Sequence, residues 1–591
     1  MLRTHTCNDL TQKHLNKEVT LCGWVNSRRD HGGIIFIDLR DRYGLTQIVF
    51  DPEVDKKCHK DADKLRREDV IQVTGKVEER KKGMKNPKLA TGDIEVFISK
   101  LMVLNQAESP PLEIDDYKLP NEATRLKYRY LDLRRPTMQN RIITRHKAAQ
   151  AVREFLNENN FLEIETPLLL KHTPEGARDY IVPSRVHPGK VYSLPQSPQL
   201  YKQTLMIAGF DRYYQLPKCL RDEDLREDRQ PEFTQIYIEM SFIEEEDIMQ
   251  LCEGLIKHIW KKSINKNLTI PFLRMTYDEA IAKYGIDRPD MRFGLELVDV
   301  TKSCEDSDFK VFRDTVKNGG IVKCVNAQQS NLSRNQIDEY IAFAQHHGAS
   351  GLAWMKVTEK GLESNIVKFF SDKIQKQLIK ATAAKPGDIL MFIADKPKKC
   401  NEILSKIRLK LGQDLKLIKD ELKFVWVVDF PMFEWDDDAK KWNAMHHPFT
   451  SPKPEDVPYL IKNPERVKAR AYDLVLNGTE LGGGSIRINK SDVQNLVFQA
   501  LAYAPEAVNA KFGFFLEALK YGTPPHGGLA FGLDRICALL CGFNDIREVI
   551  AFPKSKAAEN PMDGSPSNWD EEYLKELHLE LDAVAKKNIN Q

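Results

Sequence analysis

A basic and an acidic side chain that could hold a nucleotide stand close together in the segment Leu220-Arg221-Asp222-Glu223-Asp224. The apolar segment 213–219 precedes them and the strand-like segment 233–243 follows, so we predict a hairpin with Arg221 and Glu223 on one face of a strand. Arginine can grip a phosphate through two parallel N–H donors, and glutamate can accept hydrogen bonds from an exocyclic amine. By itself Arg-x-Glu is more often a surface ion pair, so further motifs are needed to assign a function.

The sequence contains neither of the two common glycine-rich nucleotide loops. There is no GxxxxGK[ST] loop, and no GxGxxG opens a helix after a strand. Gly482-Gly483-Gly484-Ser485 is rich in glycine, but Glu480 precedes it and no lysine follows. A protein of this sequence that uses ATP would therefore hold the phosphates with side chains.

Composition predicts a multidomain cytoplasmic protein. The 591 residues are enough for three or four domains, and 88 Lys and Arg against 86 Asp and Glu give a net charge of only +2. The ten cysteines form no CxxC pair, which argues against zinc ribbons and a disulfide framework. No apolar run approaches the roughly 18 residues of a membrane span, and the first residues lack the apolar core of a secretory signal. Because the net charge does not indicate nucleic acid, such a partner must be argued from local sites.

The first hundred residues predict a small β-barrel. β-Branched and aromatic runs predict five strands, at 18–25, 33–41, 46–51, 69–78 and 93–103. A charged stretch at 53–68 predicts a helix after the third strand. This order is that of an OB barrel, although a generic small barrel would give a similar pattern.

Two more segments accompany the arginine hairpin. Upstream, Phe161–Pro167 predicts a strand that ends at a proline, after a helix predicted for 137–160. Downstream, Gly527–Arg535 predicts a glycine-lined strand followed by an apolar helix. In this order the three segments resemble motifs 1, 2 and 3 of the class II aminoacyl-tRNA synthetases. Each is weak alone, but together they make chance agreement negligible.

Within that class the chain resembles the bacterial-type aspartyl-tRNA synthetases along essentially its whole length. The matching strings are Thr173–Tyr180, Gln196–Lys202, Ala444–Pro452 and Gly482–Arg487. The resemblance implies a multidomain α/β protein with an N-terminal OB-fold β-barrel, a class II antiparallel sheet flanked by helices, and an inserted α+β domain. The implied domains are 1–107 (OB-fold, anticodon-binding), 108–136 (linker), 137–289 (catalytic, with motifs 1 and 2), 290–420 (insertion) and 421–591 (catalytic, with motif 3 and a C-terminal extension).

The resemblance implies an aspartate–tRNA ligase that joins L-aspartate to tRNA(Asp) through an aspartyl-adenylate. ATP would be a substrate and Mg²⁺ a cofactor, and motif 1 implies a homodimer. Because the carboxylate nucleophile is already ionised at neutral pH, no general base is needed. Catalysis would be positioning plus electrostatic stabilisation, with Arg221 and Arg535 as the catalytic residues.

Aspartate requires cations for two carboxylates and an acid for its ammonium group. Lys202 and Arg487 match the family's partners of the side-chain carboxylate. The full set that the resemblance assigns to aspartate is Glu175, Ser197, Gln199, Lys202, Arg221, His446 and Arg487. Tyr237 stands where related sequences commonly have aspartate, so this chain must rely more on Glu175 and Gln199 for the ammonium group.

For ATP, the resemblance assigns Arg221 to the α-phosphate, Glu223 to the adenine amine and Arg535 to the γ-phosphate. Phe233 would stack on the adenine ring, although a phenylalanine in a strand is more often part of the core. The full ATP set is Arg221, Asp222, Glu223, Gln230, Phe233, Glu480, Gly532, Leu533, Asp534 and Arg535. Asp473 and Glu480 resemble the carboxylates that hold Mg²⁺ against the phosphates, a site of hard oxygen ligands.

In the barrel, Phe36 could stack on an unpaired anticodon base or belong to the barrel core. Arg29, Gln47 and Glu95 match family positions that hydrogen-bond to anticodon bases. His31 and Gly83 lie in loops expected near the last anticodon base, where tRNA(Asp) and tRNA(Asn) differ. Both residues resemble family members of relaxed specificity, which also charge tRNA(Asn) with aspartate. The alternative is that both are ordinary turn residues.

Two rival functions are consistent with parts of the sequence. Asparaginyl- and lysyl-tRNA synthetases share the N-terminal OB barrel, but the insertion at 290–420 and the pair Lys202 and Arg487 argue against both. The second rival is an inactive relative that serves as an RNA-binding or regulatory module. The joint presence of Arg221, Glu223, Asp473, Glu480 and Arg535 argues against it.

Overall fold

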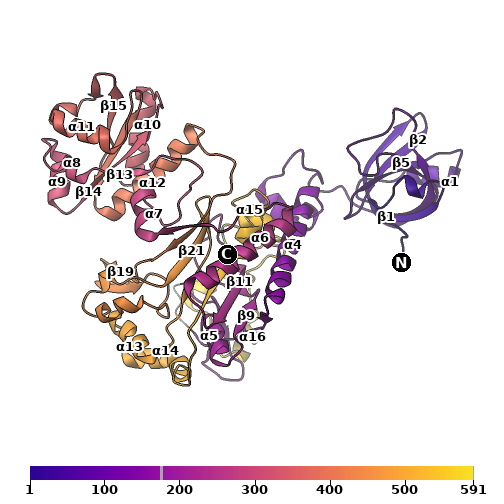
Figure 1. Ribbon diagram of the computed structural model, residues 1–591. Coiled ribbons are helices and arrows are strands. Elements are labelled where there is room, and N and C mark those ends of the chain that lie inside the picture. Colours follow the sequence, from indigo (N-terminus) through magenta and orange to yellow (C-terminus); the bar gives the residue numbers. More distant parts are fainter. Residues whose placement is uncertain (173–176, 590–591) are drawn as a thin grey trace. The chain divides into compact units, whose positions relative to one another are not determined.

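The computed structural model describes residues 1–172 and 177–589, which form two compact units (Figure 1). One unit comprises Met1–Ile143 and Arg547–Ser567, and the other comprises Thr144–Ile546 and Asn568–Gln591. Across the described ranges, no helix is both long and apolar enough to cross a membrane. The finer domain limits given above stay predictions.

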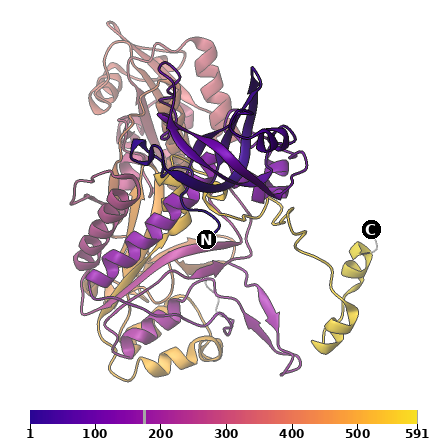
Figure 2. The ribbon, with the colours of Figure 1, turned by 90° about the vertical axis from the view of Figure 1, so that its right-hand side faces the viewer.

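Five strands of the first unit close into a barrel in the order β1-β2-β3-β5-β4 (Figure 2). They are β1 (Glu18–His31), β2 (Ile34–Arg40), β3 (Leu45–Phe50), β4 (Val70–Glu79) and β5 (Ile94–Asn105). All neighbouring pairs are antiparallel except β3 and β5. A helix, α1 (Lys56–Ala62), lies between the third and fourth strands, so the predicted OB fold is confirmed.

The helix of the barrel is shorter than the predicted span 53–68. Asp55 caps its first turn by accepting a hydrogen bond from the backbone N–H of Cys58 at 2.6 Å. Only Cys58 and Ala62 of this helix are buried. A charged segment with so few apolar residues to pack cannot extend a helix far, because tertiary packing supplies most helical stability.

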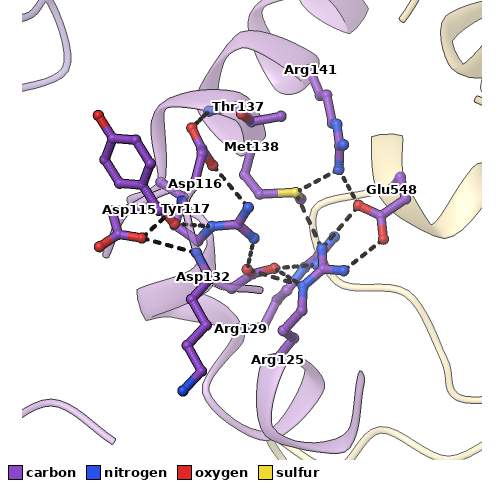
Figure 3. Close-up of polar contacts among 12 residues, drawn as sticks. Asp115, Asp116, Tyr117, Arg125, Arg129, Asp132, Thr137, Met138, Arg141 and Glu548 are labelled. Carbon is purple, nitrogen blue, oxygen red and sulfur yellow. Dashed lines mark hydrogen bonds and ion pairs between the residues drawn. The ribbon is translucent and has the colours of Figure 1, made fainter. Parts of the chain in front are cut away.

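A buried cluster of arginines joins the helices that follow the barrel. These are α2 (Glu122–Lys127), α3 (Arg129–Asp132) and α4 (Pro136–Glu158), joined by the 3₁₀ helix η5 (Ile546–Val549). Asp132 is fully buried and pairs with Arg125, Arg129 and Arg135 at 2.7–3.1 Å (Figure 3). Arg125 also pairs with Glu548 at 2.8 Å. Since loss of one partner would leave a buried charge uncompensated, the cluster fixes how these segments meet.

A mixed sheet forms the centre of the second unit. Its order is β12-β18-β21-β22-β23-β11-β9-β6, and β10 pairs with β11 off this path. The strands are β6 (Leu162–Glu163), β9 (Arg212–Gln215), β10 (Lys218–Leu220), β11 (Glu232–Ser241), β12 (Leu273–Thr276), β18 (Phe424–Val428), β21 (Ala471–Leu476), β22 (Thr479–Ile486) and β23 (His526–Gly532). The pairs from β18 to β9 are antiparallel, which confirms the predicted antiparallel sheet. The edge pairs β12–β18 and β6–β9 are parallel, a feature that the sequence did not predict.

Helices pack on this sheet. α6 (Glu245–Ile264) contacts β23, α15 (Leu533–Leu540) contacts β11, and α5 (Gln199–Ile207) contacts β9 and β11. Two further helices, α13 (Ser491–Ala500) and α14 (Pro505–Ala518), share an aromatic core that includes Phe449. The remaining elements are the hairpins β7 (Ile181–Pro183) with β8 (Val191–Ser193) and β19 (Phe433–Asp436) with β20 (Lys441–Ala444), the helices α16 (Glu571–Glu576) and α17 (Ala583–Ile589), and the 3₁₀ helices η1 (Gln12–His14), η2 (Val367–Phe369), η3 (Pro454–Tyr459) and η4 (Pro464–Arg466).

The chain between β12 and β18 contains the inserted α+β domain. After α7 (Tyr277–Tyr284) it forms a separate sheet of order β13-β14-β17-β15-β16. Its elements are β13 (Leu297–Asp299), α8 (Thr301–Cys304), α9 (Lys310–Lys317), β14 (Ile321–Ala327), α10 (Arg334–His346), β15 (Ala353–Thr358), β16 (Gly361–Glu363), α11 (Asp372–Ala381), β17 (Ile389–Asp395) and α12 (Pro397–Asp414). Arg408 of α12 is buried and donates to the backbone carbonyls of Asp290, Phe293, Gly294 and Leu295. This one guanidinium therefore fixes the segment where the insertion begins.

Candidate active site and anticodon surface

A cavity of about 430 Å³ opens over the central strands of the large sheet. It is bordered by β11, β21 and β22, the start of α5, and the segment 445–449. Six residues predicted to contact aspartate line it: Ser197, Gln199, Lys202, Arg221, His446 and Arg487. Glu175, the seventh, lies outside the described residues. The Nε2 atom of Gln199 is buried without a hydrogen-bond partner, so it is available to a ligand.

Glu239 lies beneath one end of this cavity and pairs with both cations predicted to hold aspartate. Arg487 donates through Nε and Nη2 to the two carboxylate oxygens at 2.9 and 3.2 Å, and the Nζ atom of Lys202 lies 3.2 Å from Oε2. Burial alone would raise the pKa of Glu239 above its ordinary 4.5, but Arg487 and Lys202 outweigh burial and lower the pKa to about 2. Two of these three described side chains are cations that line the cavity, so a bound anion would be attracted to this end of it.

Strand geometry explains why Glu239 fits there. On β11, alternate residues share a face, so Gln235, Tyr237 and Glu239 point the same way. The residue opposite Glu239 on the neighbouring strand β23 is Gly528, which belongs to the glycine-lined segment Gly527–Arg535. A Cβ atom at Gly528 would lie 2.0 Å from Oε2 of Glu239. Only glycine therefore leaves room for the buried carboxylate.

His447 completes the surroundings of Arg487, a role that the sequence did not predict. Its Nε2 atom lies 2.7 Å from Nη1 of Arg487, and Ser485 Oγ accepts from the same Nη1 at 2.8 Å. Because a guanidinium can only donate, Nε2 of His447 must be the acceptor. Burial and then the charge of Arg487 lower the pKa of His447 well below its ordinary value, so the imidazole is neutral.

An acidic cluster lies at another part of the same cavity. It contains Asp473 and Glu480, the predicted Mg²⁺ ligands, together with Asp287, which the sequence did not single out. Burial and then the charge of Asp473 raise the pKa of both Glu480 and Asp287. The Oδ1 atom of Asp473 is buried and lies 3.7 Å from Nε2 of His446, beyond hydrogen-bond distance, and it accepts no hydrogen bond from another described residue. Such mutually repelling carboxylates fit a divalent cation, although no three acid, histidine or cysteine groups among the described residues converge on one metal position.

A second cavity, of about 230 Å³, adjoins the first and shares Arg221, Gln235, Glu480 and Ala530 with it. Most residues predicted to bind ATP line it: Arg221, Glu223, Gln230, Phe233, Glu480, Gly532, Asp534 and Arg535. Asp222 and Leu533 do not. Asp222 is exposed, and its backbone N–H donates to the backbone carbonyl of Arg178. The side chain of Leu533 is buried in the core.

The local structure around Arg221 differs from the prediction. β10 ends at Leu220, so Arg221 and Glu223 lie in a loop rather than on one face of a strand. Arg221 nevertheless reaches the cavity because its backbone N–H donates to the Pro231 carbonyl at 2.9 Å, and its guanidinium lies 5.1 Å from the centre of the Phe233 ring. Glu223 is paired with Arg229 at 2.9 Å, an exposed contact that a nucleotide amine could replace.

In the segment that resembles motif 3, the side chain of Arg535 faces the second cavity, and the side chain of Asp534 links two elements of the fold. Arg535 donates to the backbone carbonyl of Glu480 and lies 3.4 Å from Asp228. Asp534 is buried, accepts from the backbone N–H of Thr234 at 2.7 Å and pairs with Arg145. Asp534 therefore joins α15 to β11, and it also lines part of the second cavity.

The four predicted anticodon residues lie on β1, β2, β3 and β5, which are successive neighbours in the barrel. Ile35 and Ile37 are fully buried, so Phe36 belongs to the outward-facing set and not to the core. Its ring lies 6.3 Å from that of His31. The remaining three form a chain: Arg29 donates to Gln47 at 3.4 Å, and Gln47 donates to Glu95 at 2.7 Å.

Gly83 lies in the turn between β4 and β5. Its φ of +88° is in the left-handed region, and a Cβ atom there would meet nothing within 4 Å. Glycine at this position is therefore explained by backbone conformation alone. The role assigned to Gly83 in tRNA discrimination stays a prediction.

The fold combines a closed OB barrel with a central antiparallel sheet. The second cavity is bordered by arginines and lies beside a glycine-lined strand. These features together define a class II aminoacyl-tRNA synthetase. Comparison with known families agrees. Residues 121–556 match the family described as tRNA synthetases class II (D, K and N), and residues 19–104 match the OB-fold nucleic acid binding domain. The chain therefore belongs to the class II tRNA synthetases of the D, K and N group, as the motifs predicted.

Similar proteins narrow this placement. An aspartate–tRNA(Asp/Asn) ligase of Caldanaerobacter subterraneus is 51% identical over 582 residues, which is 98% of each chain. One of Desulfosudis oleivorans is 52% identical over 589 residues, 99% of each chain. Among solved structures, asparaginyl-tRNA synthetase of Pyrococcus horikoshii with asparaginyl-adenylate has a TM-score of 0.60 at 19% identity and covers 94% of this chain and 99% of its own. Aspartyl-tRNA synthetase of Entamoeba histolytica has a TM-score of 0.59 at 20% identity and covers 94% and 92%.

We predict that Glu239→Gln lowers stability, because Lys202 and Arg487 would lose their buried counter-charge. The loss should be about 3–5 kcal/mol near neutral pH. The pKa of Glu239 is lowered from 4.5 to about 2, so its contribution is complete above pH 4.5 and disappears as the pH falls towards 2. Urea unfolding between pH 2 and 7 should show the difference between wild type and variant shrinking in that window. Asp338→Asn, in an exposed pair with Arg334, is the control and should leave the midpoint nearly unchanged.

Proposed function

We propose that this protein activates L-aspartate with ATP and transfers it to tRNA(Asp). The observation that carries the proposal is that two buried cations, Lys202 and Arg487, line the cavity of about 430 Å³. Both cations attract a side-chain carboxylate, whereas they gain no charge pairing with the amide of asparagine and they repel the ammonium of lysine. The names of the relatives, aspartate–tRNA(Asp/Asn) ligases, support the same substrate.

The two adjoining cavities suit an in-line displacement. We call the cavity of about 430 Å³ the amino-acid cavity and that of about 230 Å³ the nucleotide cavity. The α-carboxylate of aspartate would attack the α-phosphorus of ATP, forming a C–O–P bond while pyrophosphate leaves. Arg221 borders both cavities, where this bond would form, and its fixed charge would stabilise the negative charge that accumulates on the α-phosphate. A ribose hydroxyl of the tRNA would then attack the carbonyl carbon and release AMP. Arg535 lies on the far side of the nucleotide cavity, where the terminal phosphates would extend.

We assign Asp473 and Glu480 as the residues that would hold Mg²⁺. Their like charges and the raised pKa of Glu480 favour a bound cation. The ion would neutralise charge on the triphosphate, with phosphate oxygens and water as its other ligands.

We also propose a homodimer formed around motif 1. Exposed apolar side chains gather in the segment that follows it and on the projecting β7–β8 hairpin (Figure 2), namely Leu168, Leu169, Ile181, Val186 and Val191. A second copy of the chain would cover them through an isologous interface. Sedimentation at micromolar concentration distinguishes this dimer from a 68.0 kDa monomer.

None of the ten cysteines forms a disulfide, which agrees with the cytoplasm as the expected compartment.

Arg487→Leu should abolish aspartate activation. Because the substitution also removes a partner of buried Glu239, thermal unfolding of the variant must show that it is still folded at the assay temperature. The loss of charge-assisted contacts in a buried pocket costs on the order of 2–5 kcal/mol of binding. ATP–pyrophosphate exchange with aspartate, asparagine and lysine measures both the activity and its specificity. Arg487→Lys is the matched variant, because it keeps the charge but loses the planar fork. A decrease below about threefold for Arg487→Leu would contradict the assignment, and wild-type exchange with none of the three amino acids would support the inactive relative.

Asp473→Asn and Glu480→Gln should each raise the Mg²⁺ concentration needed for half-maximal exchange. Adenylate formation should slow more than aspartate binding weakens, because Glu480 lines the nucleotide cavity and Asp473 belongs to the same acidic cluster. Exchange measured across a Mg²⁺ titration, with the KM for aspartate as an internal control, provides the test. Unchanged Mg²⁺ dependence in both variants would refute the metal assignment.

We further propose that the enzyme charges tRNA(Asn) with aspartate as well. His31 lies beside Phe36 on the barrel surface and can hydrogen-bond to more than one base, and Gly83 has no side chain with which to exclude one. Charging of both purified transcripts should differ by less than about a hundredfold, or roughly 2.7 kcal/mol. His31→Leu should increase the preference for tRNA(Asp) without slowing its charging. A wild-type preference beyond a hundredfold would overturn the proposal.

A further inference from the structure

One face of β11 extends along both cavities. Phe233, Gln235, Tyr237 and Glu239 alternate along the strand and therefore share that face. Phe233 lines the nucleotide cavity, Gln235 lines both cavities, Tyr237 lines the amino-acid cavity, and Glu239 lies beneath it. At about 3.3 Å per residue, this row spans roughly 20 Å. Each side chain on it therefore faces a different part of the substrates.

Tyr237 contacts two other polar side chains of the amino-acid cavity. It is 3% exposed and packs among Met206, Tyr213 and Cys219. The Nζ atom of Lys202 lies 4.9 Å from the centre of its ring, within the range of a cation–π interaction. The phenolic hydroxyl of Tyr237 donates to Oε1 of Gln235 at 2.8 Å.

The hydrogen bond to Gln235 sets the orientation of its amide. With Oε1 held by the Tyr237 hydroxyl, the Nε2 group, which only donates, is directed elsewhere. Gln235 lines both cavities, at the place where the α-carboxylate and the α-phosphate would meet. An amide donor there would contact the oxygens whose charge changes during the displacement.

The ring of Tyr237 acts on Lys202 in a different way. An uncharged aromatic face stabilises the ammonium group without cancelling its charge. The ring therefore helps to hold Lys202 at its place in the lining of the cavity.

We propose that Tyr237 is a positioning residue with two separable functions. Its ring holds Lys202 for the side-chain carboxylate of the amino acid, and its hydroxyl orients Gln235 towards the reacting oxygens. The proposal rests on the aspartate-activating function argued above, and it assigns binding to the ring and the chemical step to the hydroxyl.

Aspartate-dependent ATP–pyrophosphate exchange in the full-length enzyme tests this division. Tyr237→Phe keeps the ring and removes the hydroxyl, so kcat should fall about tenfold while the KM for aspartate stays within about twofold. Tyr237→Leu removes both, so the KM for aspartate should also rise about tenfold. Gln235→Ala should lower kcat, and adding Tyr237→Phe to it should cause no further decrease, because the hydroxyl acts through Gln235.

The chain offers a matched control on the neighbouring strand. Tyr213 of β9 is also buried and donates to Oε1 of Gln215, two residues along, at 2.6 Å, but neither residue lines a cavity. Tyr213→Phe removes the same kind of hydrogen bond and should leave kcat and KM unchanged. Thermal unfolding of each variant separates loss of fold from loss of function.

Three results would overturn the proposal: an unchanged kcat in Tyr237→Phe, an unchanged KM in Tyr237→Leu, or additive losses in the double variant. A decrease in Tyr213→Phe equal to that in Tyr237→Phe would likewise show a general effect of the sheet. If the wild type itself fails to activate aspartate, the proposed function fails and this proposal with it. Wild-type exchange with unaffected variants would remove this proposal alone.

Discussion

Glu239 can be buried only because Lys202 and Arg487 are buried with it. An isolated charge in the interior costs several kcal/mol, so each of the three groups requires the other two. They come from β11, from α5 and from the residue after β22, and their pairing fixes these elements against one another. The same constraint determines the neighbouring strand, where Gly528 leaves room for the carboxylate. The structure of this part of the sheet and the two cations that it presents to the cavity therefore have one physical origin.

The amino-acid cavity has opposite charges in different parts. Lys202 and Arg487 provide positive charge at one part, whereas Asp287, Asp473 and Glu480 form an acidic cluster at another. A ligand with separated charges has one orientation that satisfies both, so the electrostatics orient the substrate before any specific hydrogen bond forms. His447, held neutral beside Arg487, adds a hydrogen-bond acceptor without weakening this polarity.

The order of the strands predicted the barrel. Short strings of distinctive residues predicted the central sheet and the site residues, most of which line one of the two cavities. The sequence did not predict Glu239, whose partner Arg487 is 248 positions away and whose own surroundings are ordinary strand residues. Asp222 and Leu533 were also predicted to contact ATP, but neither lines the second cavity, because the chain directs neighbouring side chains to different sides. The strand predicted at Arg221 ends one residue earlier, since the backbone there bonds to Pro231. In each case the missing information was a contact between distant segments.

The inserted domain lies between two strands, β12 and β18, that are parallel neighbours in the large sheet. Such neighbours need a crossover of at least a dozen residues, so a connection would be present at this point in any protein with this sheet. The insertion lengthens that connection without interrupting a strand. Arg408, which belongs to the inserted domain, fixes the segment where the insertion begins. A chain built in this way can gain, lose or exchange a whole domain while every ladder of the catalytic sheet stays intact.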